Sequence, residues 1–171
     1  MEKMLTKIKI RSSIKSMKLT SVFKILPTQI AYAHCDIPCG IYDPNQAQLA
    51  AHTVYRMTQL FEEHKDSVHD AARIVHVKEE HGEIVEDGLG TLENDYFKSE
   101  HFETFPELKG LIADAVQLSV KTRQKVDIAL AAELVEKVSQ IAEIFYRTKG
   151  VTPVRVKSVY PTELEYITYA E

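Results

Sequence analysis

The sequence predicts an all-α protein, an antiparallel up-and-down four-helix bundle. Apolar residues recur at helical spacing in four separate stretches, and the connections between these stretches are short, which favours antiparallel neighbours. The chain has 171 residues, of which 44% are hydrophobic and 27% charged, so a single domain can bury a sizeable core. No apolar run approaches the roughly 18 residues that span a bilayer, and we expect no membrane span.

The expected helices have recognisable ends. Asp43 and Pro44 are typical of a helix start, and Gly150 is typical of a residue that follows a helix. Glycines within the second stretch predict a kink or break ahead of residues 92–97, and these are Gly82, Gly88 and Gly90. The four helices are expected at about residues 43–64, 66–91, 105–121 and 126–149.

Residues 1–33 differ in composition from the rest of the chain. They contain seven basic residues and one acid, which leaves 14 basic against 24 acidic residues and a formal charge of −10 for the remainder. Such a basic segment ending in Ala-Tyr-Ala predicts a leader or pro-segment removed on maturation, with a disordered arm as the alternative. Lys24 and Pro27 interrupt its apolar stretch, which favours a cytoplasmic precursor over export through a signal peptide. The acidic body argues against a nucleic-acid partner.

The remaining chain divides into a domain at 34–150 and a tail at 151–171. Pro153 and Pro161 exclude a helix locally, and the valines around them favour extended chain. The tail is expected either to be disordered or to pack on a neighbour, and its sequence predicts no function.

Both cysteines of the chain lie in the turn HCDIPCGIYDP at 34–44. A disulfide between Cys35 and Cys39 is one interpretation, although so short a loop gives a weak covalent constraint. The other is a metal site, because Pro38 and Gly40 curl the backbone and let two thiolates converge. Two thiolates alone do not complete a tetrahedral zinc site, so further ligands are needed.

Cleavage after Ala33 would supply those ligands. His34 would then carry a free α-amine, which joins the amide nitrogen of Cys35 and the two thiolates in a planar N₂S₂ set, with the imidazole free to approach axially. Square-planar nitrogen and sulfur donors suit Ni(II) or Cu(II) rather than zinc. The anionic donors favour one-electron oxidation of the metal, so the turn predicts redox chemistry.

The turn resembles the nickel hook of nickel superoxide dismutases, almost residue for residue. The similarity continues in NDYFKSEHFETFPELKGLI and SQIAEIFYRTK and covers about 34–149. It implies a nickel-dependent antioxidant oxidoreductase, a homohexamer of four-helix bundles with an N-terminal metal-binding hook. The implied reaction converts superoxide to dioxygen and hydrogen peroxide by Ni(II)/Ni(III) cycling, after a maturation protease exposes the hook. A non-enzymatic nickel or copper carrier with the same hook is the alternative.

The resemblance also assigns roles within the hook. It implies that His34, Cys35 and Cys39 are the metal ligands, and that Asp36 and Pro38 shape the turn around them. Other histidines at 64, 69, 76 and 81 lack the spacing of a zinc or di-iron motif, and we expect them to be solvated or partly buried.

Outside the ligands, the resemblance implies that the hydroxyls of Tyr42 and Tyr96 border the substrate pocket and that Lys98 attracts the anion. The sequence departs from the family at two positions. Where the best-known members have an acid and an arginine that steady the axial imidazole, this chain has Ala50 and His81. Both charges are absent together, so no charge is left unpaired. We hypothesise that His81 orients the axial imidazole directly or through water.

Overall fold

The structure, a computed structural model, describes residues 40–170. Its four long helices are α1 (Asn45–His64), α2 (Val68–Thr91), α4 (Leu108–Gln124) and α5 (Ile128–Thr148). A π-helical turn, η2 (Leu92–Tyr96), and the short α3 (Ser99–Thr104) connect α2 to α4. Two antiparallel strands, β1 (Thr152–Lys157) and β2 (Glu165–Ala170), follow α5.

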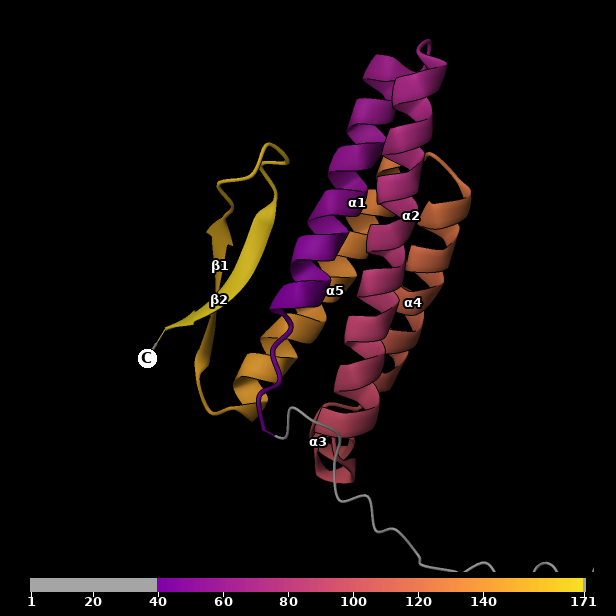
Figure 1. The fold of residues 1–171 in the computed structure, drawn as a ribbon. Coiled ribbons are helices and arrows are strands. Elements are labelled where there is room, and N and C mark those ends of the chain that lie inside the picture. The colour runs from indigo at the N-terminus through magenta and orange to yellow at the C-terminus, as the bar shows by residue number, and fades with distance from the viewer. Residues whose placement is uncertain (1–39, 171) are drawn as a thin grey trace, which may run out of the picture. The chain divides into compact units, whose positions relative to one another are not determined.

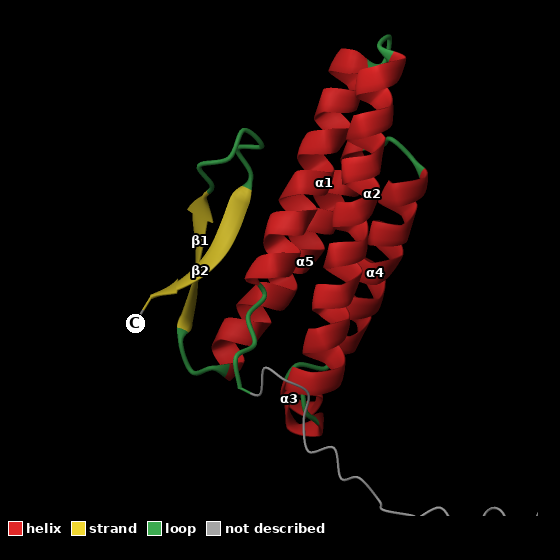
Figure 2. Ribbon diagram, viewed as in Figure 1, coloured by secondary structure: helices red, strands yellow, loops and turns green. Residues whose placement is uncertain are grey.

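The long helices form the predicted bundle. Each packs on its neighbour along the chain and α5 returns to α1, as Figures 1 and 2 show. The four helices enclose one apolar core. The fold class predicted from the sequence is therefore confirmed for the described residues, whereas the hook residues before Gly40 lie outside them. The core includes side chains that are at most 2% exposed, among them Val54, Leu89, Leu134, Ile141 and Phe145.

α2 is an unbroken helix through all three glycines, so the break predicted at them is wrong. Two of the glycines allow close packing instead. A Cβ on Gly82 would lie 2.5 Å from Cγ of Arg123, and one on Gly88 would lie 3.3 Å from Cβ of Ala47. Tertiary contact thus outweighs the roughly 1 kcal/mol by which glycine disfavours a helix. The regular helix gives way only in η2, after the last glycine.

A buried lysine of α2 closes the C-terminal end of α4. The Lys78 side chain is 1% exposed, and its Nζ donates hydrogen bonds to the carbonyl oxygens of Thr122, Arg123 and Lys125. Carbonyls in the last turn of a helix have no partner within that helix, and a cation there also interacts favourably with the negative end of the helix dipole. Burial lowers the pKa of Lys78. One side chain therefore joins the middle of α2 to the C-terminal end of α4.

The tail forms a β-hairpin that packs on the bundle. Ile167 in β2 is fully buried in the core, and Arg155 in β1 donates to the carboxylates of Glu136 at 2.8 Å and Glu143 at 2.5 Å, both on α5. The extended chain predicted from the valines is confirmed, and the tail is ordered against its own domain.

None of the helices in residues 40–170 combines the length and apolar character that a bilayer crossing requires.

Candidate functional site

Two of the predicted site residues meet where the chain enters α1. Tyr42 precedes α1 by three residues and Tyr96 ends η2, and their ring centroids are 5.7 Å apart. Both rings pack partly buried against the core. Gly40, with φ of +84°, adopts a left-handed conformation just ahead of Tyr42. Tyr42, near the end of the predicted hook, therefore packs on an aromatic side chain of the bundle.

The hydroxyl of Tyr96 is held by the end of α5. It donates a hydrogen bond to Oγ1 of Thr148 at 2.7 Å, because the Thr148 hydroxyl itself donates to the carbonyl of Phe145 at 2.6 Å. The Tyr96 ring stacks on His101 with centroids 5.6 Å apart, and Nζ of Lys149 lies 4.6 Å above its centroid. Burial raises the pKa of Tyr96, and the Thr148 bond partly offsets this rise. The hydroxyl is thus protonated and fixed in orientation at neutral pH.

No role is predicted from the sequence for Thr148 or Lys149. They lie about fifty residues from Tyr96 in the chain, and only the antiparallel course of α5 brings them together. Both belong to the stretch SQIAEIFYRTK, which carries part of the resemblance. A lysine after a helix end is, however, an ordinary feature, since it complements the helix dipole.

Lys98 lies two residues after Tyr96, at the start of α3. Its side chain is at the surface, where Nζ donates to the carbonyl of Asp95 at 2.8 Å. Its backbone N–H donates to Nδ1 of His101 at 3.0 Å, which fixes the first turn of α3. The structure therefore places positive charge on the loop that carries Tyr96, and attraction of an anion by Lys98 stays a prediction.

His81 and Ala50 lie on α2 and α1. Ala50 is buried in the core, whereas His81 is half-buried and its Nδ1 donates to the carbonyl of Val77 at 2.9 Å. Because Gly88 lies against Ala47, the seven residues from Gly88 to His81 put His81 about 10 Å along the bundle from Ala47. An imidazole bound by His81 would have to lie that far along α1.

The predicted metal ligands His34, Cys35 and Cys39 lie outside the described residues, as do Asp36 and Pro38. Within residues 40–170, no three His, Cys, Asp or Glu side chains are grouped as a metal site. Of the histidines considered in the sequence, one ends α1 and three lie on α2. The fit of a metal therefore depends on the donor chemistry of the hook.

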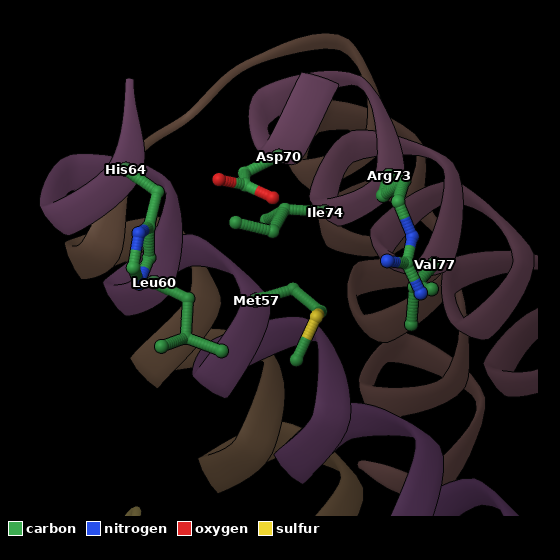
Figure 3. A pocket seen from close by; sticks show the side chains of 7 residues that line it. All are labelled: Met57, Leu60, His64, Asp70, Arg73, Ile74 and Val77. Carbon is green, nitrogen blue, oxygen red and sulfur yellow. The ribbon is translucent and has the colours of Figure 1, made fainter. Parts of the chain in front are cut away.

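A surface pocket of 340 Å³ lies between the far ends of α1 and α2, remote from the two tyrosines. Figure 3 shows that α1 and α2 both contribute side chains to its lining. The residues around it are Met57, Leu60, His64, Asp70, Arg73, Ile74 and Val77. None of the residues predicted for the site lines it.

The fold and the tyrosine contact together define a class of protein: a four-helix bundle in which two tyrosine rings meet where the chain enters its first helix. Residues 29–149 match the family model described as nickel-containing superoxide dismutase. The chain belongs to the nickel-containing superoxide dismutase family. The resemblance stated from the sequence is thereby confirmed.

Two relatives from Streptomyces have the name superoxide dismutase [Ni]. The chain is 37% identical to that of Streptomyces seoulensis, over 68% of this chain and 88% of the relative. It is 34% identical to that of Streptomyces coelicolor, over 72% of this chain and 93% of the relative. The matches therefore span nearly all of each relative and leave part of this chain unmatched.

Solved structures of the family agree with the bundle. The native structure of a nickel superoxide dismutase superimposes with a TM-score of 0.65 at 34% identity, covering 68% of this chain and 99% of that chain. A nickel-containing superoxide dismutase whose nickel ligation corresponds to the state after partial X-ray-induced reduction gives a TM-score of 0.65 at 36% identity, with the same coverage. The family match ends at residue 149, before β1 begins at Thr152, so the hairpin is an addition to the shared fold.

Proposed function

We propose that this chain disproportionates superoxide, using nickel bound by His34, Cys35 and Cys39 after removal of residues 1–33. Two superoxide ions and two protons give one dioxygen and one hydrogen peroxide. Membership of the family supports the activity, and the matched range includes all three proposed ligands. The observation that carries the proposal is the contact of Tyr42 with Tyr96, which lines the entry of the hook with phenol groups.

The residues of the hook fit nickel by their chemistry. His34, Cys35 and Cys39 would offer an amine, a deprotonated amide and two thiolates, and such donors would suit Ni(II) or Cu(II) better than zinc. Nickel in such a donor set supplies one-electron exchange with superoxide.

The bundle contributes a fixed, neutral aromatic surface beside the hook. Thr148 orients the Tyr96 hydroxyl, and the raised pKa keeps this phenol protonated, so no negative charge from it repels the substrate. Lys149 adds a cation above the same ring, where the charge is stabilised by the aromatic face. These residues order water or superoxide at the hook and limit access to it.

Maturation and assembly belong to the same proposal. A protease that cuts after Ala33 must act before nickel is bound, because the amine of His34 exists only after the cut. A cytoplasmic location is favoured over export by the interrupted apolar stretch of the leader. Assembly as a homohexamer follows from the resemblance and is checked by sedimentation velocity of the mature protein.

The proposal is tested on protein purified from its own cell. N-terminal sequencing, metal analysis and a superoxide assay are carried out on the same sample. We expect an N-terminus at His34, nickel bound by each chain and rapid loss of superoxide. A working form that begins upstream of His34, or that contains no nickel, would show the proposal to be wrong. Thiol titration of the metal-free protein separates the metal site from the alternative of a disulfide between Cys35 and Cys39, because the disulfide would leave no free thiol.

Lys98→Glu is expected to lower the catalytic rate constant severalfold at low salt. The acidic body repels an anion, so attraction must come from local positive charge. The loss should shrink as the screening length falls from about 30 Å at 0.01 M salt to about 10 Å at 0.1 M. Pulse radiolysis at salt concentrations across this range measures the catalytic rate constant. Lys65→Glu is the matched control, because it makes the same change in charge beyond the other end of α1, about 30 Å away.

His81→Ala tests the replacement for the missing acid and arginine. If His81 orients the imidazole of His34, we expect turnover to fall about tenfold and the visible spectrum of the nickel protein to shift, as for other groups that hold a metal ligand. His76→Ala is the control, since His76 is an exposed histidine of the same helix that pairs with Glu80. Unchanged turnover and an unchanged spectrum in His81→Ala would refute the hypothesis.

A further inference from the structure

The hairpin lies against the N-terminal half of α1, the helix that the hook leads into (Figure 1). The free edge of β2 meets α1 through backbone groups that β1 does not use. Gln48 is 2% exposed, and its amide pairs with both backbone groups of Ile167: Oε1 accepts from the N–H at 2.9 Å and Nε2 donates to the carbonyl at 3.1 Å. A single side chain of α1 thus takes the place of a neighbouring strand.

His52, one turn after Gln48, continues this contact. Its Nε2 donates to the carbonyl of Glu165 at 3.2 Å, and its Nδ1 accepts from the hydroxyl of Thr162 at 3.0 Å. The ring also packs edge-on against Tyr160. Burial lowers the pKa of His52, and the bond to Glu165 opposes this only in part. The imidazole is therefore a neutral part of the interface.

The third contact reaches the first turn of α1. The hydroxyl of Tyr166 donates to Oδ1 of Asn45, the first residue of α1. The backbone N–H of Asn45 in turn donates to Oδ1 of Asp43 at 2.7 Å, one residue after Tyr42. Burial, followed by the charges of neighbouring groups that include Asp43, raises the pKa of Tyr166, which keeps its hydroxyl a donor. Hydrogen bonds therefore connect the hairpin, through Asn45, to Asp43 at the end of the turn 34–44.

We propose that Tyr166 is a positioning residue for the nickel hook: by holding Asn45 it fixes the first turn of α1, and with it the direction in which residues 40–42 lead to the metal ligands. The inference rests on the proposed function for the hook itself. The hairpin lies beyond the family match, so it is a support that this chain adds to the shared site. Gln48 and His52 hold the hairpin on α1. The Tyr166 hydroxyl in turn holds the side chain of Asn45, the first residue of that helix.

Tyr166→Phe in the full chain removes one hydroxyl and leaves the ring and the rest of the interface in place. Tyr160→Phe is the matched control, because Tyr160 lies in the same hairpin and its hydroxyl makes no hydrogen bond within residues 40–170. Amide exchange is measured first on the metal-free proteins. Ni(II) affinity is then measured by competition with a chelator, on protein whose N-terminus has been brought to His34.

We expect the amides of residues 43–48 to exchange about fivefold faster in Tyr166→Phe, the change that follows from one lost hydrogen bond. Ni(II) affinity should fall by a similar factor, and the nickel–thiolate absorption should shift. Tyr160→Phe should match the parent in all three measurements. Both variants should melt close to the parent, which separates positioning from a loss of fold.

Equal exchange in Tyr166→Phe and the parent would overturn the inference, as would faster exchange with unchanged Ni(II) affinity and spectrum. The two proposals fail in different samples. A parent protein that binds no Ni(II) refutes the hook, and the positioning role with it, whereas a parent that binds nickel normally leaves the comparison of variants to decide on Tyr166 alone.

Discussion

A chain that retains Ala33 in front of His34 is expected to have no dismutase activity above that of the metal-free protein, whereas a chain that begins at His34 is active. The extra residue converts the α-amine of His34 into an ordinary amide. The turn would then no longer offer an amine nitrogen beside the amide nitrogen of Cys35 and the two thiolates that would hold nickel. The measurement compares nickel content and superoxide consumption of both proteins after identical loading with Ni(II).

The control for this comparison carries an added alanine after Glu171 and begins at His34. It has the same length and composition as the retained-Ala33 chain, so a difference between the two isolates the position of the residue. Full activity with Ala33 in place would contradict the prediction, because it would mean that the amine is not a ligand.

Replacement of Lys78 by methionine is expected to lower the free energy of unfolding by about 3 kcal/mol, the upper range for leaving buried polar groups without a partner. Methionine fills nearly the same volume, but it donates no hydrogen bond to the three carbonyls at the end of α4. Urea denaturation of the metal-free protein measures the change as a shift of the midpoint, with the slope of the unfolding free energy against urea concentration unchanged.

Lys137→Met is the matched control for Lys78. Lys137 pairs with Asp114 at 3.1 Å on the surface, and such pairs contribute about 0–1 kcal/mol. If the two variants were destabilised equally, the buried lysine would not hold α4, and a general effect of losing a positive charge would be the better explanation.

The sequence predicted the bundle well because helical periodicity is a local property. The same reasoning failed at Gly82 and Gly88, where the absence of a side chain serves packing against Arg123 and Ala47. A glycine that ends a helix and one that lets two helices approach are alike in sequence, and only the partner helix distinguishes them. The short α3 has too few residues to show a period and was not predicted.

Long-range contacts limited the prediction of the site. Tyr42 and Tyr96 were found through their motifs, and the structure brings them together. Thr148 and Lys149 were missed because their contact with Tyr96 depends on where α5 ends. The valines of the tail indicated extended chain, but the pairing of Gln48 with Ile167 joins residues 119 positions apart, and no local pattern indicates it.

The amide of Gln48 has a consequence for how such chains diverge. It is buried, and its partners are the backbone groups of Ile167. A chain that keeps the hairpin but replaces Gln48 by an apolar residue would leave the N–H and the carbonyl of the buried Ile167 without a partner, which destabilises the fold by about 1–3 kcal/mol. Selection should therefore retain the glutamine at this helix position for as long as the C-terminal extension is retained.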